Sequence, residues 1–149
     1  MSLFTIGYEG STQPAVIAAL REAGVARLID VRAVPQSRKP GFSKRLLAAS
    51  VTAAGMQYTH LRALGTPKPG RDAVRHGRPE EMRRIFLEHM QEPAAQAELA
   101  QAAALAAEGP VCLLCFEHDP AHCHRTIIAE LLGRVPIHLV AAEPRSEPP

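Results

Sequence analysis

The sequence lacks any hydrophobic run long enough to cross a membrane, since its apolar runs fall far short of about 18–20 residues. Its first ten residues also lack the basic start and long apolar stretch of a secretory signal, so we expect none. Cysteine is scarce, and an odd count of three indicates reduced thiols rather than a disulfide scaffold. These absences exclude the membrane and secreted classes and predict a cytoplasmic protein without a membrane partner.

What is present suits one globular domain. The 149 residues are enough for a single core, and 46% apolar with 21% charged residues excludes a disordered or coiled-coil chain. The Pro-rich, polar residues 143–149 predict a disordered tail after a domain over residues 1–142.

Charge is spread unevenly along the chain, although the net charge is only +2. Residues 32–84 hold 12 of the 17 basic residues and 3 of the 15 acidic ones, a balance of +9 that leaves −7 for the rest. One-sided charge of this kind predicts an anionic partner, either a small molecule or a nucleic acid.

Short apolar runs alternate with amphipathic segments, which predicts a three-layer α/β/α domain with a mainly parallel sheet of about five strands. Residues 62–79, with three Gly and three Pro, predict a long basic loop. The predicted strands are 3–6, 27–31, 56–61, 111–116 and 136–140, and the predicted helices are about 12–23, 43–54, 80–91, 94–108 and 124–132.

Most reactive residues follow the predicted strands, and a parallel sheet gathers such segments at its carboxyl edge. Cys123, His124 and Arg125 begin a predicted helix, where the helix dipole favours a thiolate. The pattern suits a nucleophilic thiol, and it suits equally a phosphate held without attack. A structural cysteine is the third interpretation. Glu117 ends the preceding strand as a candidate base or arginine partner.

Asp30 and Arg32 share one face of a strand, either as an orienting ion pair or with Asp30 as a catalytic group. The five basic residues from Arg32 to Arg45, without an acid in this stretch, predict a phosphate-binding surface. Aromatic residues near strand ends could form a stacking wall or complete the core, and these are Tyr8, Phe42, Tyr58 and Phe116.

Metal binding has weaker support. Cys112 and Cys115 form a C-x-x-C pattern, but residues three apart in a strand face opposite sides, so both are expected in the core. Zinc-ligand types recur at irregular spacing in His118, His122, Cys123 and His124. We therefore predict neither a metal nor a cofactor.

Several stretches occur in the order typical of one known family. They are residues 5–11, Asp30-Val31-Arg32 with Pro35 and Ser37, Tyr58 and His60 with Leu64-Gly65, and residues 114–117 leading to Cys123-His124-Arg125. Over about residues 3–133 the chain resembles the domain of unknown function 488 family, which implies a small cytosolic α/β protein and no settled activity. Many members have a shorter Gly-x-Ser loop in place of residues 7–11, which leaves the role of Ser11 open.

Two functional hypotheses follow. The first is a Cys-dependent hydrolase or transferase acting on a phosphate-bearing substrate, a nucleotide or nucleic acid. The second is a non-catalytic nucleic-acid-binding module with residues 32–84 as its basic footprint. For the enzyme, the candidate catalytic residues are Cys123, Asp30, Glu117 and His124, and the candidate substrate-binding residues are Arg32, Arg125, Tyr8, Ser11, Ser37, Arg38, Tyr58 and His60.

Overall fold

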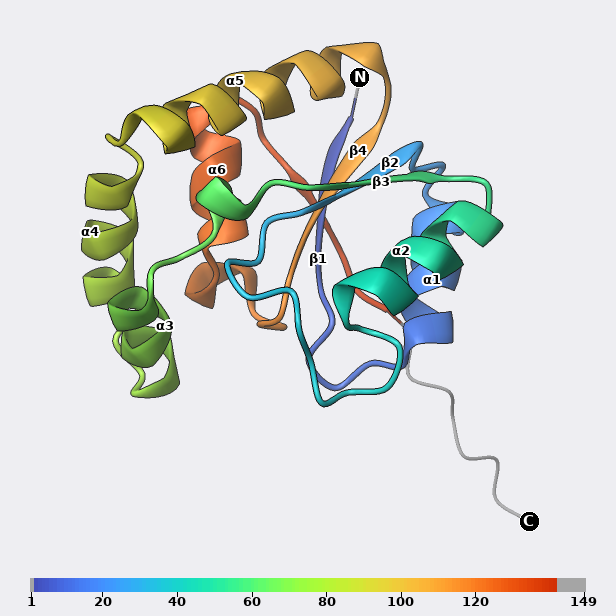
Figure 1. Ribbon diagram of the computed structural model, residues 1–149, viewed down its shortest axis with the longest axis horizontal. Helices are drawn as coiled ribbons and strands as arrows, with labels where there is room; N and C mark the ends of the chain where they lie inside the picture. The colour runs from blue at the N-terminus through green and yellow to red at the C-terminus, as the bar shows by residue number, and fades with distance from the viewer. Residues whose placement is uncertain (1, 142–149) are drawn as a thin grey trace.

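Five parallel strands form a single sheet in the computed structural model, which describes residues 2–141 (Figure 1). The order across the sheet is β3-β2-β4-β1-β5, which confirms the predicted parallel α/β fold. The predicted tail at 143–149 lies outside the described residues. The strands are β1 (Leu3–Gly7), β2 (Arg27–Asp30), β3 (Gln57–His60), β4 (Val111–Cys115) and β5 (Ile137–Leu139).

Helices cover both faces of this sheet, as predicted (Figure 1). On one face, α1 (Gln13–Glu22) and α2 (Lys44–Ala53) contribute to the apolar cluster that includes Phe4, Leu28 and Leu114. The other face is covered by α3 (Lys68–Arg75), α4 (Pro79–His89), α5 (Pro93–Glu108) and α6 (His124–Leu131). Within residues 2–141, no helix combines the length and hydrophobicity of a membrane span.

The central strand β4 is buried along its whole length, which explains its continuous apolar sequence. Side chains alternate along it: Cys112 packs into the cluster beside α1 and α2, whereas Leu113 and Cys115 pack into the opposite one. The prediction that the two cysteines of the C-x-x-C pattern face opposite sides is therefore confirmed.

The prediction of a long loop over residues 62–79 is wrong. This segment contains a 3₁₀ turn, η1 (Arg62–Leu64), and the helix α3. Pro69 lies in the first turn of α3, where no helical hydrogen bond needs its missing N–H. Gly70 is a packing residue, because a Cβ there would lie 2.3 Å from Cγ2 of Thr66. Proline and glycine thus mark a helix start and a close approach.

Candidate functional site

A cavity of about 610 Å³ opens at the carboxyl edge of the sheet, where β1, β2 and β4 end. We call it the rim pocket. Its walls come from the segments at and after the ends of these three strands, and from Thr66 and one side of α3. The sheet topology therefore brings together segments from both ends of the chain, as expected for a parallel sheet.

Cationic side chains outnumber carboxylates in the rim pocket. Arginines 32, 38, 71 and 75 line it together with two histidines, against Glu9, Glu117 and Asp119. Arg71 donates from Nη1 to the Thr66 carbonyl at 2.8 Å, and exposed Arg75 lies 3.6 Å from Asp72. Arg38 is exposed and makes no hydrogen bond or ion pair with residues 2–141. Arg38 is thus free to contact an incoming anion, and Arg75 is held only by an exposed ion pair with Asp72.

Arg32 is held in the pocket wall by a buried network. Its Nε and Nη2 donate to Asp30 at 2.9 and 2.7 Å, and its Nη1 donates to the Phe42 carbonyl at 2.7 Å. Burial alone would lower the pKa of Arg32, but the hydrogen bonds and charge of Asp30 reverse this and raise it. Arg32 is therefore a permanently charged part of the wall.

Asp30 lies behind Arg32, fully buried and away from the pocket lining. Its Oδ2 also accepts from the Tyr58 hydroxyl at 2.5 Å. His60 contacts the Arg32 carbonyl through Nε2 at 2.8 Å. This geometry corresponds to the orienting ion pair, one of the two interpretations of Asp30 and Arg32. Tyr58 and His60 support Arg32 from outside the pocket lining.

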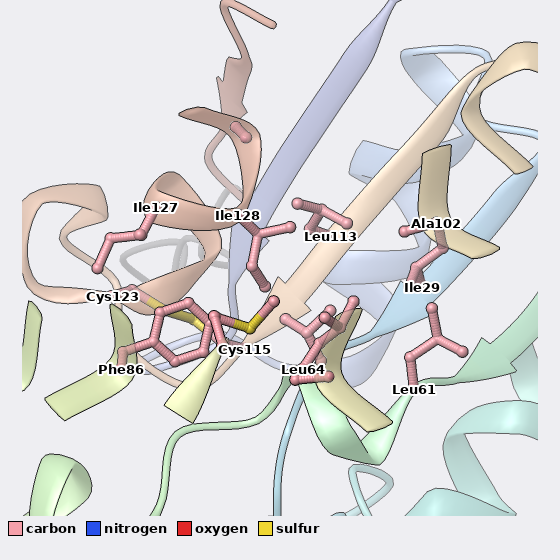
Figure 2. Close-up of a cluster of buried hydrophobic side chains, with 14 of the residues drawn as sticks. Ile29, Leu61, Leu64, Phe86, Ala102, Leu113, Cys115, Cys123, Ile127 and Ile128 are labelled. Carbon is pink, nitrogen blue, oxygen red and sulfur yellow. A yellow bond between two sulfur atoms is a disulfide. The ribbon is translucent and has the colours of Figure 1, made fainter. Parts of the chain in front are cut away.

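The end of β4 joins the start of α6 through sulfur. Cys115 and Cys123 form a disulfide in this structure, with Cα atoms 7.3 Å apart, although the sequence indicates reduced thiols. Figure 2 shows both cysteines among apolar side chains, including Phe86 and Ile128. Cys115 lines the rim pocket, whereas Cys123 lies beneath it with 2% of its surface exposed. Cys112 is free and buried.

His124 also reaches the rim pocket, and its protonation is defined by its partners. Nε2 lies 2.6 Å from the Val31 carbonyl, which can only accept, so Nε2 carries the proton. Burial lowers the pKa of His124 to about 4, and the imidazole is neutral near pH 7. The free Nδ1 lone pair lies 3.8 Å from Sγ of Cys123.

Arg125 is buried below the pocket, outside its lining, and is 1% exposed. It donates to Oγ1 of Thr5 at 3.1 Å, to Sγ of Cys115 at 3.0 Å and to the backbone carbonyls of Glu117 and His118 at 2.6 and 3.2 Å. Arg125 thus shapes the loop after β4 and does not act as a clamp inside the pocket.

Gly7 is required for this arrangement. A Cβ at Gly7 would lie 1.7 Å from the Glu117 carbonyl oxygen and 3.0 Å from Nη1 of Arg125. Only glycine lets the end of β1 approach the loop after β4 this closely.

Glu117 combines a pocket position with a perturbed acidity. Burial raises its pKa above the ordinary value, although its own backbone hydrogen bond and the charge of Arg125 oppose the shift. Nearby, Glu9 accepts from the His118 backbone N–H at 3.0 Å. A carboxyl group with a raised pKa in a cleft is a candidate general acid or base.

The structure brings half of the predicted site residues into one pocket. Cys123, Asp30, Arg125, Ser11, Tyr58 and His60 do not line it. Among the aromatic residues near strand ends, Tyr8 and Phe42 belong to the core. Their rings stack with centroids 4.3 Å apart, and both side chains are buried. Phe116 is 45% exposed at the pocket. The predicted residues that do line it are Tyr8, Arg32, Ser37, Arg38, Glu117 and His124.

Sequence reasoning missed several pocket residues, and three of them matter most for the chemistry of the site. Arg71 and Arg75 lie four residues apart on α3, a spacing that places them on one helix face. Because the segment was predicted to be a loop, this spacing did not predict that the two side chains lie together. Cys115 was expected only in the core, yet it is the last residue of β4 and therefore reaches the rim.

Comparison with known proteins gives one match. The family model described as "Domain of unknown function DUF488" matches residues 12–132, which span most of the chain and nearly all of the pocket lining. No curated protein and no solved structure matches the chain.

Proposed function

The chain belongs to the family of the domain of unknown function DUF488, and from this premise we propose that it is an enzyme acting on a phosphate-bearing small molecule in the rim pocket. The observation that carries the proposal is the set of arginines from separate segments around one cavity. Arginine suits phosphate because its planar guanidinium donates two parallel hydrogen bonds.

The arginines divide into two roles. Arg32 is fixed by Asp30 and supplies a constant positive field in the wall. Arg38 and Arg75 are exposed; Arg38 has no ion pair within residues 2–141, and Arg75 has one exposed pair with Asp72, which an incoming phosphate could replace. We assign phosphate contact to these two, with Arg71 as a further arginine of the lining.

Glu117 supplies the candidate chemistry. Its raised pKa suits proton transfer to or from an oxygen of a phosphate ester, provided the substrate reaches it. A thiol mechanism through Cys123 has less support, because Cys123 is 2% exposed, is bonded to Cys115 in this structure and does not line the pocket. The odd cysteine count supports placing this activity in the reducing cytoplasm.

The shape of the site favours a small molecule over a nucleic acid. The cavity volume lies within the about 300–1,000 Å³ usual for small-ligand sites. Three carboxylates in its lining would oppose a continuous phosphate backbone. Phe116, exposed at the edge, offers a ring on which a nucleotide base could stack.

The test is calorimetric binding of inorganic phosphate, a nucleoside monophosphate and a nucleoside triphosphate, with EDTA present. We expect at least one of these probes to bind, and the double variant Arg38→Ala/Arg75→Ala to weaken it roughly 10- to 100-fold, because charged hydrogen bonds are lost. The matched control is Arg45→Ala/Arg84→Ala, which removes two exposed arginines outside the rim pocket.

Catalysis is tested with the two nucleotide probes by measuring released phosphate. Glu117→Gln should keep the binding and lose about 10²- to 10⁴-fold in turnover, because the proton-transfer group is gone. Binding by none of the probes, or equal binding by both double variants, would refute the proposed site. Binding that falls steeply with salt for a single-stranded oligonucleotide alone would favour the nucleic-acid-binding module.

A further inference from the structure

We propose that reduced Cys115 and Cys123, together with His124, form a zinc site that opens into the rim pocket. The two sulfur atoms and a ring nitrogen of His124 all lie within 4.8 Å of one another. Two thiolates and an imidazole are ligands that zinc prefers in proteins, and three protein ligands leave one position of a tetrahedron open.

The spacing of the cysteines supports two ligands better than a permanent covalent bond. Their Cα atoms are 7.3 Å apart, whereas most disulfides span about 4.4–6.8 Å. Two-electron reduction by a dithiol would cleave the bond and give two thiols, and each thiol would lose its proton on binding the metal. The compartment predicted from the cysteine count would supply such reductants.

His124 is already prepared as a ligand. The Val31 carbonyl accepts the Nε2 proton at 2.6 Å, which fixes the tautomer and leaves Nδ1 with a free lone pair. That Nδ1 atom lies 3.8 Å from Sγ of Cys123. Histidines that bind metals usually donate their second ring N–H to a carbonyl or carboxylate in this way.

Arg125 supplies a second, independent observation. It is almost fully buried, and no carboxylate among residues 2–141 lies within 4.0 Å of it. Its acceptors are a hydroxyl, two carbonyls and Sγ of Cys115, so in the disulfide form no anion touches its charge, and Glu117 and Asp119 act on it only from beyond 4.0 Å. A Cys115 thiolate at 3.0 Å would provide one, because buried charges need partners. The Arg125 guanidinium is thus placed to stabilise an anionic sulfur at Cys115.

The open position would face the proposed substrate. Cys115 and His124 both line the rim pocket, whereas Cys123 anchors the site from below. A zinc ion held there could bind a water or a phosphate oxygen in its fourth position. His118 and His122, which the sequence suggests as zinc ligands, do not join this cluster in the described part of the chain.

The experiment compares reduced and oxidised protein. The full chain is reduced with a phosphine, exchanged into metal-free buffer and titrated with Zn²⁺ and with Co²⁺. We expect about one ion per chain, and for cobalt the near-ultraviolet band of thiolate charge transfer. Oxidised protein should bind neither Zn²⁺ nor Co²⁺ at Cys115 or Cys123, because their sulfur atoms are then joined in a disulfide. Equal binding by both forms, or no binding by the reduced form, would overturn the proposal.

Matched variants identify the ligands. Cys115→Ser and Cys123→Ser should each abolish the cobalt–thiolate band or shift it strongly, and His124→Gln should weaken zinc affinity by more than about 10-fold. The control is Cys112→Ser, because Cys112 is equally buried but faces the opposite side of the sheet. Wild-type affinity in both ligand-cysteine variants would disprove the site.

Alkylation of wild-type protein provides a test that needs no variant to fold. Zinc should protect Cys115 and Cys123 from a thiol reagent, as read residue by residue by mass spectrometry, and unchanged rates at both would contradict the proposal. Phosphate binding is measured separately in EDTA, so loss of the metal site and loss of the proposed function give different results.

Discussion

Two buried arginines support the pocket, and they differ in how their charge is balanced. Arg32 faces a carboxylate that accepts two of its hydrogen bonds. Arg125 faces oxygen atoms without net charge and one sulfur. The charge of Arg32 is therefore balanced by an anion in direct contact within the folded chain. The charge of Arg125 would gain such a contact only if Cys115 became a thiolate.

The largest expected effect comes from unbalancing Arg32. Asp30→Asn keeps the shape of the side chain but leaves the buried guanidinium without its counter-ion, which should lower the free energy of unfolding by about 3–5 kcal/mol. Urea unfolding measures this loss. Arg32→Met added to Asp30→Asn should recover part of it, and a double variant no more stable than Asp30→Asn would show that the ion pair is not the cause.

A smaller loss of folding stability is expected at Gly7, which packs against the loop that Arg125 holds. Gly7→Ala would place a Cβ against the Glu117 carbonyl and displace the loop that Arg125 holds. We expect a loss of about 1–3 kcal/mol, as for an overpacked core. Gly109→Ala is the control, because a Cβ there would lie at an ordinary 3.6 Å from Ala26. Equal losses in the two variants would contradict the close approach at Gly7.

The smallest expected effect is a pH dependence of folding stability. It arises from Tyr58, which donates a hydrogen bond to Asp30, the ion-pair partner of Arg32. Burial and the charge of Asp30 raise the pKa of Tyr58 above its ordinary value near 10. The folded state then holds this proton more tightly, so stability should fall as pH rises above about 10, by at most about 1.4 kcal/mol per pH unit. Tyr58→Phe should make that slope shallower in urea unfolding at several alkaline pH values. An unchanged slope would exclude Tyr58 as its source.

The sequence predicts the layers of this fold because its strands are short apolar runs between amphipathic helices. It also predicts which segments meet, since a parallel sheet brings strand ends to one edge. It could not show that Asp30 lies behind Arg32. An orienting ion pair and a catalytic Asp30 both require the same two-residue spacing, so the sequence cannot distinguish them. Arg71 and Arg75 escaped notice for a different reason: Pro69 and Gly70 have the composition of a loop but belong to a helix.

The cysteines show the limit of motif reading most clearly. Spacing relates Cys123 to His124 and Arg125, which are its neighbours in the chain. The sulfur that reaches the pocket belongs to Cys115, which reads as core because it ends an apolar strand. Distances between segments decide such roles, and one sequence does not contain them.

The position of β4 between β1 and β2 also has a consequence for synthesis on the ribosome. Leu3 pairs with Val111 and Gly7 with Cys115, so each contact closes a loop of more than a hundred residues. Loops of this length slow folding, because their entropy is lost before the contacts form. β2 can pair with β3 as soon as β3 emerges, but β1 must wait for β4, and the pocket is therefore among the last parts of the nascent chain to assemble.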